Sequence, residues 1–223
     1  MRLKFMATIT LCLLLMLVAS SSFADPECMG DVNCDRIVDG RDLAEFANDF
    51  GETICPACIT APVAKTGQTA SYATGDDGVW QMGVDWPQPR FIDNHDGTVT
   101  DNLTGLRWLK NANCYGIRNW AAAVTDANNL NSGECGLSDG SAAGEWRLAN
   151  LKELHSLTDF SNYSPALPSG HPFTGVQSGY YWSSNTVASY TDNRWYVDMR
   201  NGIVYYYHKT NPYYVWPVRG GLD

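Results

Sequence analysis

An apolar segment near the amino terminus predicts that this chain leaves the cytoplasm. Arg2 and Lys4 give a basic start, and residues 6–19 form an almost uninterrupted apolar run. Ser22 and Ala24 are the small residues that a signal peptidase requires just before its cut. The run is short for a helix that must cross roughly 30 Å of hydrocarbon, although an uncleaved anchor is the alternative. We therefore expect a signal peptide, a secreted or extracytoplasmic protein, and no membrane insertion after cleavage.

Export makes the cysteines informative, because an even number of them in an exported chain indicates disulfide bonds. Six follow the predicted cleavage site: Cys28, Cys34, Cys55, Cys58, Cys114 and Cys135. We expect the first four to pair among themselves, Cys28 and Cys34 with Cys55 and Cys58, in an order that stays open. Cys114 then pairs with Cys135. The spacing of Cys55 and Cys58 also occurs in redox and zinc sites, but no second such pair completes a zinc site.

The charge of the chain is strongly negative and unevenly distributed. Without Arg2 and Lys4, 13 basic side chains stand against 24 acidic ones, a net charge of −11. This sign disfavours nucleic acid, sulfated polyanions and anionic membranes as partners. Nine of the acids lie in residues 25–58, opposed only by Arg36 and Arg41. Such crowding of carboxylates predicts either a bound cation or a solvated acidic linker.

The spacing of oxygen side chains in this acidic segment matches a calcium-binding loop. Loop positions 1, 3, 5, 9 and 12 carry oxygen side chains, and position 7 offers a backbone carbonyl, as a hard cation with about six to eight ligands requires. The predicted ligands are Asp31, Asn33, Asp35, the carbonyl of Ile37, Asp39 and Asp42. A helix should follow the loop, because apolar residues recur there at helical spacing: Leu43, Phe46, Ala47 and Phe50.

The same stretch resembles a type I dockerin repeat. The matching residues are Gly30-Asp31-Val32-Asn33, Asp35, Asp39 and Asp42-Leu43. The resemblance implies calcium as a cofactor, a loop that no helix precedes, and a cohesin-like partner. Two features depart from the family. The chain has one repeat where dockerins carry two, and Arg36 stands at the sharp turn where glycine is favoured.

The remainder of the chain has the pattern of an α+β domain. All eight Trp and all twelve Tyr lie after residue 71. Short alternating segments with turn signals between them predict strands at 90–93, 98–100, 106–109, 180–182, 194–200, 203–209 and 213–218. Asp96-Gly97 is a hairpin signal and predicts a turn between the first two of these strands. Because the predicted helices fall between two groups of strands, we expect an antiparallel sheet with two helices.

Both predicted helices are recognisable from their apolar faces. The first presents Trp120, Val124, Ala127 and Leu130 on one side. The second begins at Asn150, with Glu153 three residues later to complete a capping box. Its buried stripe is expected to be Leu151, Leu154 and Leu157.

Asn201-Gly202 is the strongest hairpin signal in the chain and predicts a two-residue type I′ turn. That turn pairs residue 200 with 203, 198 with 205, 196 with 207, and 194 with 209. One face of the hairpin is apolar enough to be the core side and carries Trp195, Val197, Met199, Val204, Tyr206 and His208. The other face combines aromatic rings with hydrogen-bonding groups, as sugar binding requires, and its candidate ligand residues are Tyr196, Asp198, Arg200, Tyr205 and Tyr207. The alternative is that these tyrosines only stabilise the sheet.

The order of motifs in this domain resembles the family of domains found at the carboxyl terminus of the Legionella collagen-like adhesin. The matching motifs are Pro89-Arg90-Phe91, Asp96 to Asp101, Leu103 to Leu106, Trp108, Glu145 to Leu148, Lys152-Glu153-Leu154, Tyr181 to Ser184, and Val215 to Gly220. The family usually has proline at the position of Ala149. The resemblance implies a C-type-lectin-like fold and glycan binding, although the acidic charge disfavours sulfated glycans here.

These features predict a secreted, non-catalytic binding or adhesion module for a glycan or a cell-surface protein. No enzyme activity is expected, because the four histidines show no metal-ligand spacing and no nucleophile motif is present. The alternative function is that of a structural component held to a partner through the dockerin-like segment. The predicted organisation is a signal peptide at 1–24, the calcium segment at 25–60 and the C-type-lectin-like domain at 61–223.

Overall fold

The computed structural model describes residues 63–220. The predicted signal peptide, the calcium loop and Cys28, Cys34, Cys55 and Cys58 lie outside the described residues, so those assignments stay predictions. Within 63–220, no helix is long and apolar enough to cross a membrane. The same residues contain no group of three or more His, Cys, Asp or Glu side chains that could hold a metal ion.

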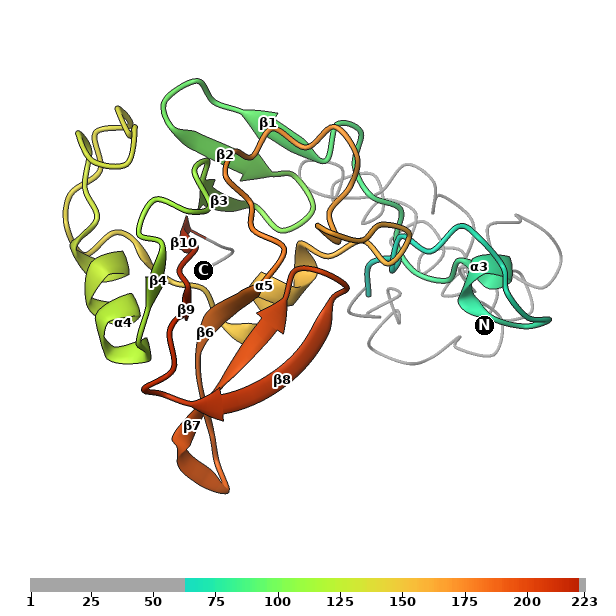
Figure 1. The fold of residues 1–223 in the computed structure, drawn as a ribbon. Helices are drawn as coiled ribbons and strands as arrows, with labels where there is room; N and C mark the ends of the chain where they lie inside the picture. Colours follow the sequence, from blue (N-terminus) through green and yellow to red (C-terminus); the bar gives the residue numbers. More distant parts are fainter. Residues whose placement is uncertain (1–62, 221–223) are drawn as a thin grey trace, which may run out of the picture. The chain divides into compact units, whose positions relative to one another are not determined.

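The domain contains two five-stranded sheets (Figure 1). The first is antiparallel, in the order β1 (Phe91–Asp93), β2 (Thr98–Asp101), β3 (Leu106–Leu109), β10 (Pro217–Gly220) and β5 (Arg147–Leu148). The turn predicted at Asp96-Gly97 joins β1 to β2, and Asp96 accepts hydrogen bonds from the backbone N–H and hydroxyl of Thr98. The predicted strands at the start of the domain are therefore confirmed.

The second sheet has the order β4 (Ile117–Arg118), β9 (Tyr213–Tyr214), β6 (Tyr180–Val187), β7 (Tyr190–Asp198) and β8 (Ile203–His208). Its pairings are antiparallel except for β6 with β9. The single strand predicted at 213–218 is wrong, because β9 ends in this sheet and β10 begins in the other. Val215 and Trp216 are buried between these two strands, so the chain crosses from one sheet to the other there.

Three helices are present in the described part of the chain: α3 (Asp77–Trp80), α4 (Trp120–Asn129) and α5 (Leu151–Ser156). The expectation of two helices missed α3, which is too short to show a period. The capping box of α5 is confirmed, since Asn150 and Glu153 each accept a hydrogen bond from the other's backbone N–H. Leu154 and Leu157 are fully buried as predicted, whereas Leu151 is only partly covered. The α+β class therefore holds.

Trp216 lies at the centre of the core that joins the two sheets. Its ring contacts Trp108 of β3 at 5.7 Å, Tyr181 of β6 at 5.4 Å and Phe173 at 4.9 Å between centroids. Its indole N–H donates to the carbonyl of Leu109 at 2.9 Å. Buried aromatic rings contribute large apolar areas, so this cluster fixes how the second sheet is oriented on the first.

The predicted Cys114–Cys135 disulfide is confirmed, with the two Cα atoms 5.6 Å apart. It links the segment before β4 to the loop after α4, and both cysteines pack against the core. The bond therefore closes a loop that contains the whole of α4, which fixes the ends of that helix next to the second sheet.

Candidate functional site

The β7–β8 hairpin closes with a longer loop than its sequence predicts. Asp198 pairs with Ile203, Tyr196 with Tyr205, and Arg194 with Tyr207. The predicted register, with 200 opposite 203, 198 opposite 205 and 196 opposite 207, is therefore wrong by two residues.

Hydrogen bonds to Asp198 explain the longer loop. The Asp198 carbonyl accepts from the backbone N–H groups of Asn201 and Gly202, at 3.2 and 2.8 Å, and its carboxylate accepts from the N–H of Arg200. Gly202 has a φ of +78°, but Asn201 is not among the described residues with positive φ. The type I′ turn is therefore excluded, because it needs positive φ at both central residues.

A shift of two residues keeps the alternation of side chains between the two faces. Val197 and Met199 are fully buried in the core, as predicted for that side, whereas His208, which was expected on the same side, is exposed. On the opposite face, Ile203, Tyr205 and Tyr207 of β8 are 55%, 53% and 50% exposed. The change of register thus alters which residues are opposite each other but not which residues share a surface.

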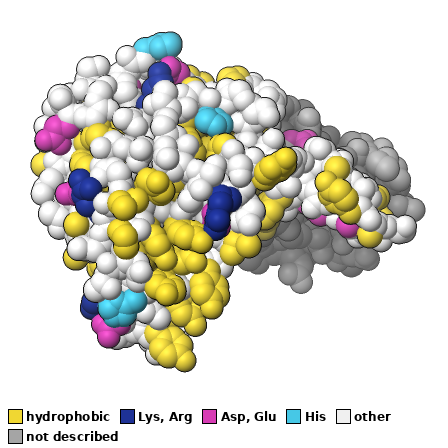
Figure 2. Space-filling view, in the orientation of Figure 1, with side chains coloured by type: hydrophobic (Ala, Val, Ile, Leu, Met, Phe, Trp, Pro, Cys, Tyr) yellow, Lys and Arg dark blue, Asp and Glu magenta, His cyan; other side chains and the backbone are white. Residues whose placement is uncertain are grey.

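Five tyrosines from four adjacent strands form this opposite surface, which we call the tyrosine face: Tyr180, Tyr196, Tyr205, Tyr207 and Tyr213. Tyr180, Tyr196 and Tyr213 contact one another with ring centroids 4.9 to 5.0 Å apart. Tyr205 contacts Tyr196 at 6.4 Å and stacks on Tyr206 at the edge strand. Hydrophobic side chains, tyrosines included, gather over β6, β7 and β8 in Figure 2. Four of the five rings therefore support one another, and Tyr207 lies on β8 two residues from Tyr205.

The inner tyrosines are protected from ionisation. Burial raises the pKa of Tyr213 to about 12, and the neighbouring hydroxyls of Tyr196 and Tyr180 add to the rise. Burial also raises the pKa of Tyr196, which is 8% exposed. Both hydroxyls consequently remain hydrogen-bond donors throughout the neutral and moderately alkaline range.

Arg200 borders the tyrosine face and is held there by two neighbours. Its guanidinium donates to both carboxylate oxygens of Asp198, at 2.7 to 3.0 Å, and its Nη2 donates to the Tyr180 hydroxyl at 2.8 Å. The hydrogen bonds that Arg200 donates to the Asp198 carboxylate raise the pKa of Arg200 above its ordinary value. Asp198 itself is 4% exposed, so the sequence-predicted ligand residue lies beneath the surface and positions Arg200.

The other end of the same sheet surface is covered by α4. Trp120 of α4 lies against Arg194, whose guanidinium carbon is 4.1 Å from the ring centroid. Trp182 is fully buried, and its ring centroid lies 4.4 Å from that of Tyr213. The exposed part of the sheet therefore ends where the helix begins, and this leaves a bounded patch of rings with one fixed cation.

Sequence reasoning found three of the five tyrosines and missed Tyr180 and Tyr213. These two come from β6 and β9, which the hairpin pattern alone does not bring next to β7. The aromatic run at residues 180–182 was the available signal, since it marks a strand rich in rings.

A comparison with protein-family models gives a match to the Lcl C-terminal domain over residues 97–219, which is more than half of the 223-residue chain. No curated protein matches the chain. The match covers β2 to β10 apart from the last residue of β10, and so includes the tyrosine face, but it does not reach residues 25–60. By this match, the resemblance drawn from the motifs of the main domain is confirmed, and the chain belongs to the Lcl C-terminal domain family.

Proposed function

We propose that this protein is a secreted, non-catalytic carbohydrate-binding module and that the glycan lies on the tyrosine face. The observation that carries the proposal is the group of tyrosine rings bordered by Arg200. Sugar rings have apolar C–H faces that pack on aromatic rings, and their hydroxyls need donors and acceptors nearby. The tyrosine face offers both within one bounded surface.

The rings of Tyr205 and Tyr207 are exposed enough to contact a glycan directly. Tyr205 and Tyr207 are about half exposed and lie two residues apart on β8, so their side chains leave the same side of the strand. Ile203, two residues before Tyr205 on the same strand, is 55% exposed, so three apolar side chains on one side of β8 meet the solvent together. Tyr180, Tyr196 and Tyr213 would then act mainly as the support that fixes the two outer rings.

The charges nearby favour a neutral glycan. Arg200 already shares its charge with Asp198 and so offers its remaining N–H groups as hydrogen-bond donors to hydroxyl oxygens. With an excess of acids in the whole chain, a sulfated glycan would be repelled at long range. A C-type-lectin-like fold, which the motifs imply, and delivery to the cell surface or periplasm form part of the same proposal.

The test is a glycan array probed with the mature chain, in the presence of calcium and again with a chelator. Binding to neutral glycans in both conditions supports the proposal. No bound glycan, together with a protein partner that the wild type captures and Asp35→Ala does not, would favour the alternative of assembly through the calcium segment.

A further inference from the structure

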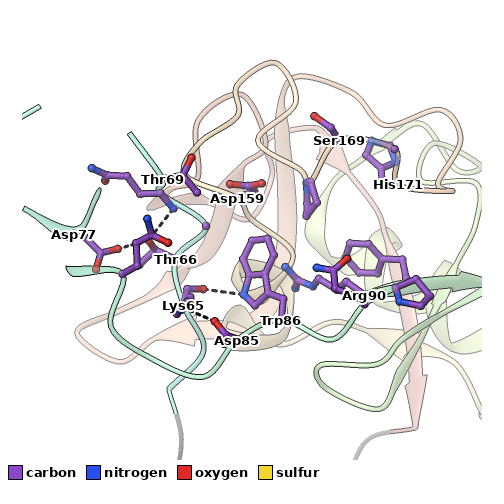
Figure 3. A pocket seen from close by; sticks show the side chains of 18 of the residues that line it. Lys65, Thr66, Thr69, Asp77, Asp85, Trp86, Arg90, Asp159, Ser169 and His171 are labelled. Carbon is purple, nitrogen blue, oxygen red and sulfur yellow. Dashed lines mark hydrogen bonds and ion pairs between the residues drawn. The ribbon is translucent and has the colours of Figure 1, made fainter. Parts of the chain in front are cut away.

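The same domain has a concave surface whose lining residues differ from those of the tyrosine face. It is a groove of about 450 Å³ between two segments of the chain, residues 65–91 and 159–172. Figure 3 shows its side chains, among them Trp86, Arg90, Asp159 and His171. None of the five tyrosines lines it.

Several contacts hold the two segments in place around the groove. The N–H of Phe160 donates to the carbonyl of Thr66 at 3.1 Å, and the N–H of Thr69 donates to the Ser161 hydroxyl at 3.0 Å. Gly67 allows the closest approach, because a Cβ there would meet Asp159 Oδ1 and, at 2.7 Å, the ring of Trp86. The groove is therefore a fixed part of the fold and not a gap between loose loops.

Arg90 lies in the wall of this groove with one hydrogen-bonding group unused. Its guanidinium carbon is 4.3 Å from the centroid of the Trp86 ring, its Nε donates to Asp101 at 3.4 Å, and its Nη2 donates to the carbonyl of Ser156. Arg90 is 5% exposed, and its Nη1 has no partner among residues 63–220. Buried donors in native proteins are almost always paired, so Nη1 is hydrogen-bonding capacity that the described residues leave unused.

A second buried polar atom in the groove wall, Nδ1 of His171, also lacks a hydrogen-bond partner within the described residues. His171 follows Ser169 and Gly170, which are exposed at the rim. Five other buried polar atoms of the described residues also lack a hydrogen-bond partner, among them Trp108 Nε1 in the core, but Arg90 and His171 both line the groove.

The charges that line the groove and the ring of Trp86 favour a ligand with neutral hydroxyl groups over an anionic ligand. Three acids line the groove, Asp77, Asp85 and Asp159, against two bases, Lys65 and Arg90. An anionic ligand would add to this excess of negative charge. A hydroxyl instead accepts from a guanidinium and donates to a carboxylate, and Trp86 provides a flat apolar surface for the C–H face of a sugar.

We propose that this groove is a second saccharide site, separate from the tyrosine face, and that it takes a short neutral saccharide of one or two rings. Its volume lies within the range of small-ligand sites, about 300 to 1,000 Å³. The tyrosine face is open and suits an extended glycan surface, whereas the groove suits the end of a chain or a free sugar. Together the two sites would make one domain bivalent.

The experiment uses ¹⁹F NMR of the mature chain labelled with 5-fluorotryptophan. Cellobiose, maltose, lactose and diacetylchitobiose are titrated as probes. The resonance of Trp86, assigned by its loss in Trp86→Phe, should shift saturably with at least one probe. The resonance of Trp80, assigned by its loss in Trp80→Phe, is the control. Trp80 is 63% exposed and does not line the groove, so its resonance should not shift when a probe binds in the groove.

Variants separate this site from the tyrosine face. Gln88 lies at an exposed position of the groove wall. Trp86→Phe and Gln88→Ala should each weaken binding of the probe about fivefold, the scale of one ring or hydrogen-bond contact. Calorimetric titration measures both affinities, because Trp86→Phe lacks the Trp86 resonance. Tyr205→Ala should leave the Trp86 shift unchanged. The proposal is overturned if the Trp86 resonance stays fixed with all four probes, or if Trp86→Phe and Gln88→Ala bind as the wild type does. Loss of array binding in Tyr205→Ala tests the tyrosine face independently.

Discussion

The carboxylate of Asp198 holds the guanidinium of Arg200 through three hydrogen bonds and also accepts the backbone N–H of Arg200. One buried acid thus fixes both the loop of the β7–β8 hairpin and the cation beside the tyrosine face. The same residue therefore takes part in setting the register and in placing the charge.

Replacing Asp198 should therefore affect stability and binding together. We expect Asp198→Ala to lower the free energy of unfolding by about 2 kcal/mol, because buried hydrogen bonds to charged groups are lost, and to weaken glycan binding by releasing Arg200. Urea denaturation and a binding titration measure the two effects. Asp192→Ala is the control, since Asp192 lies on the same strand and pairs with Lys209 at an exposed position, where its loss should change little. Equal effects of the two substitutions would contradict this role of Asp198.

Local signals in the sequence predicted local structure well. The capping box at Asn150 and Glu153, the turn at Asp96-Gly97 and the helix α4 each involve neighbours within a few residues, and all are present. The face of α4 was predicted only in part, because its buried residues are Ala123 and Ala127 and Ala123 was not among those expected. The prediction of a two-residue turn at Asn201-Gly202 was wrong because the carboxylate and carbonyl of Asp198 accept hydrogen bonds from the N–H groups of the loop. The preference of a dipeptide for a turn type does not take such contacts with a preceding residue into account.

Features that depend on distant segments could not be predicted in this way. The division of residues 213–218 between two sheets depends on Trp216 entering the core, and the membership of Tyr180 and Tyr213 in the tyrosine face depends on strand order. The groove combines residues about 70 positions apart, among them Trp86 and Asp159, and no periodic pattern relates them.

The Cys114–Cys135 bond should contribute measurably to stability. Its cysteines are 21 residues apart, so loop closure predicts a loss of about 3 kcal/mol when both are changed to alanine. Peptide mapping without reductant should recover the two cysteines in one linked fragment. A free thiol at either position in the secreted protein, or a double variant as stable as the wild type, would contradict this assignment.

The Glu153 carboxyl should make the free energy of unfolding depend on pH. Its burial alone would raise the pKa of the carboxyl, but hydrogen bonds from Arg147 and from the N–H of Asn150 bring the pKa below the ordinary value of 4.5. The unfolded chain therefore binds the proton first, and stability present above about pH 4.5 is lost as the pH falls through the lower folded pKa.

We expect Glu153→Gln to flatten the fall in urea midpoint between about pH 5 and pH 3 relative to the wild type. Glu145→Gln is the control, because the Glu145 side chain is 52% exposed and its bond to Arg219 is 3.2 Å long. If both variants lose stability with the same slope as the wild type, Glu153 does not carry the effect.

The calcium segment gives a prediction that rests on spacing alone. The mature chain should bind one calcium ion through Asp31, Asn33, Asp35, Asp39, Asp42 and the Ile37 carbonyl. Calorimetric titration should show binding in the wild type and loss of it in Asp35→Ala, and Arg36→Gly should tighten binding by easing the sharp turn. Equal heats in wild type and Asp35→Ala would refute the site.

The central claim is that glycan binds on the tyrosine face, and the most direct measurement compares array binding of four tyrosine variants. Tyr205→Ala and Tyr207→Ala remove half-exposed rings, so they should abolish binding of the glycans that Trp86→Phe still binds, and change the free energy of unfolding by less than about 1 kcal/mol. Tyr196→Ala removes a ring that is 8% exposed and should cost about 3 kcal/mol of stability. Tyr72→Ala removes an 86% exposed ring elsewhere and should bind as the wild type does. Full binding by folded Tyr205→Ala and Tyr207→Ala would contradict the account and leave these tyrosines as scaffold only.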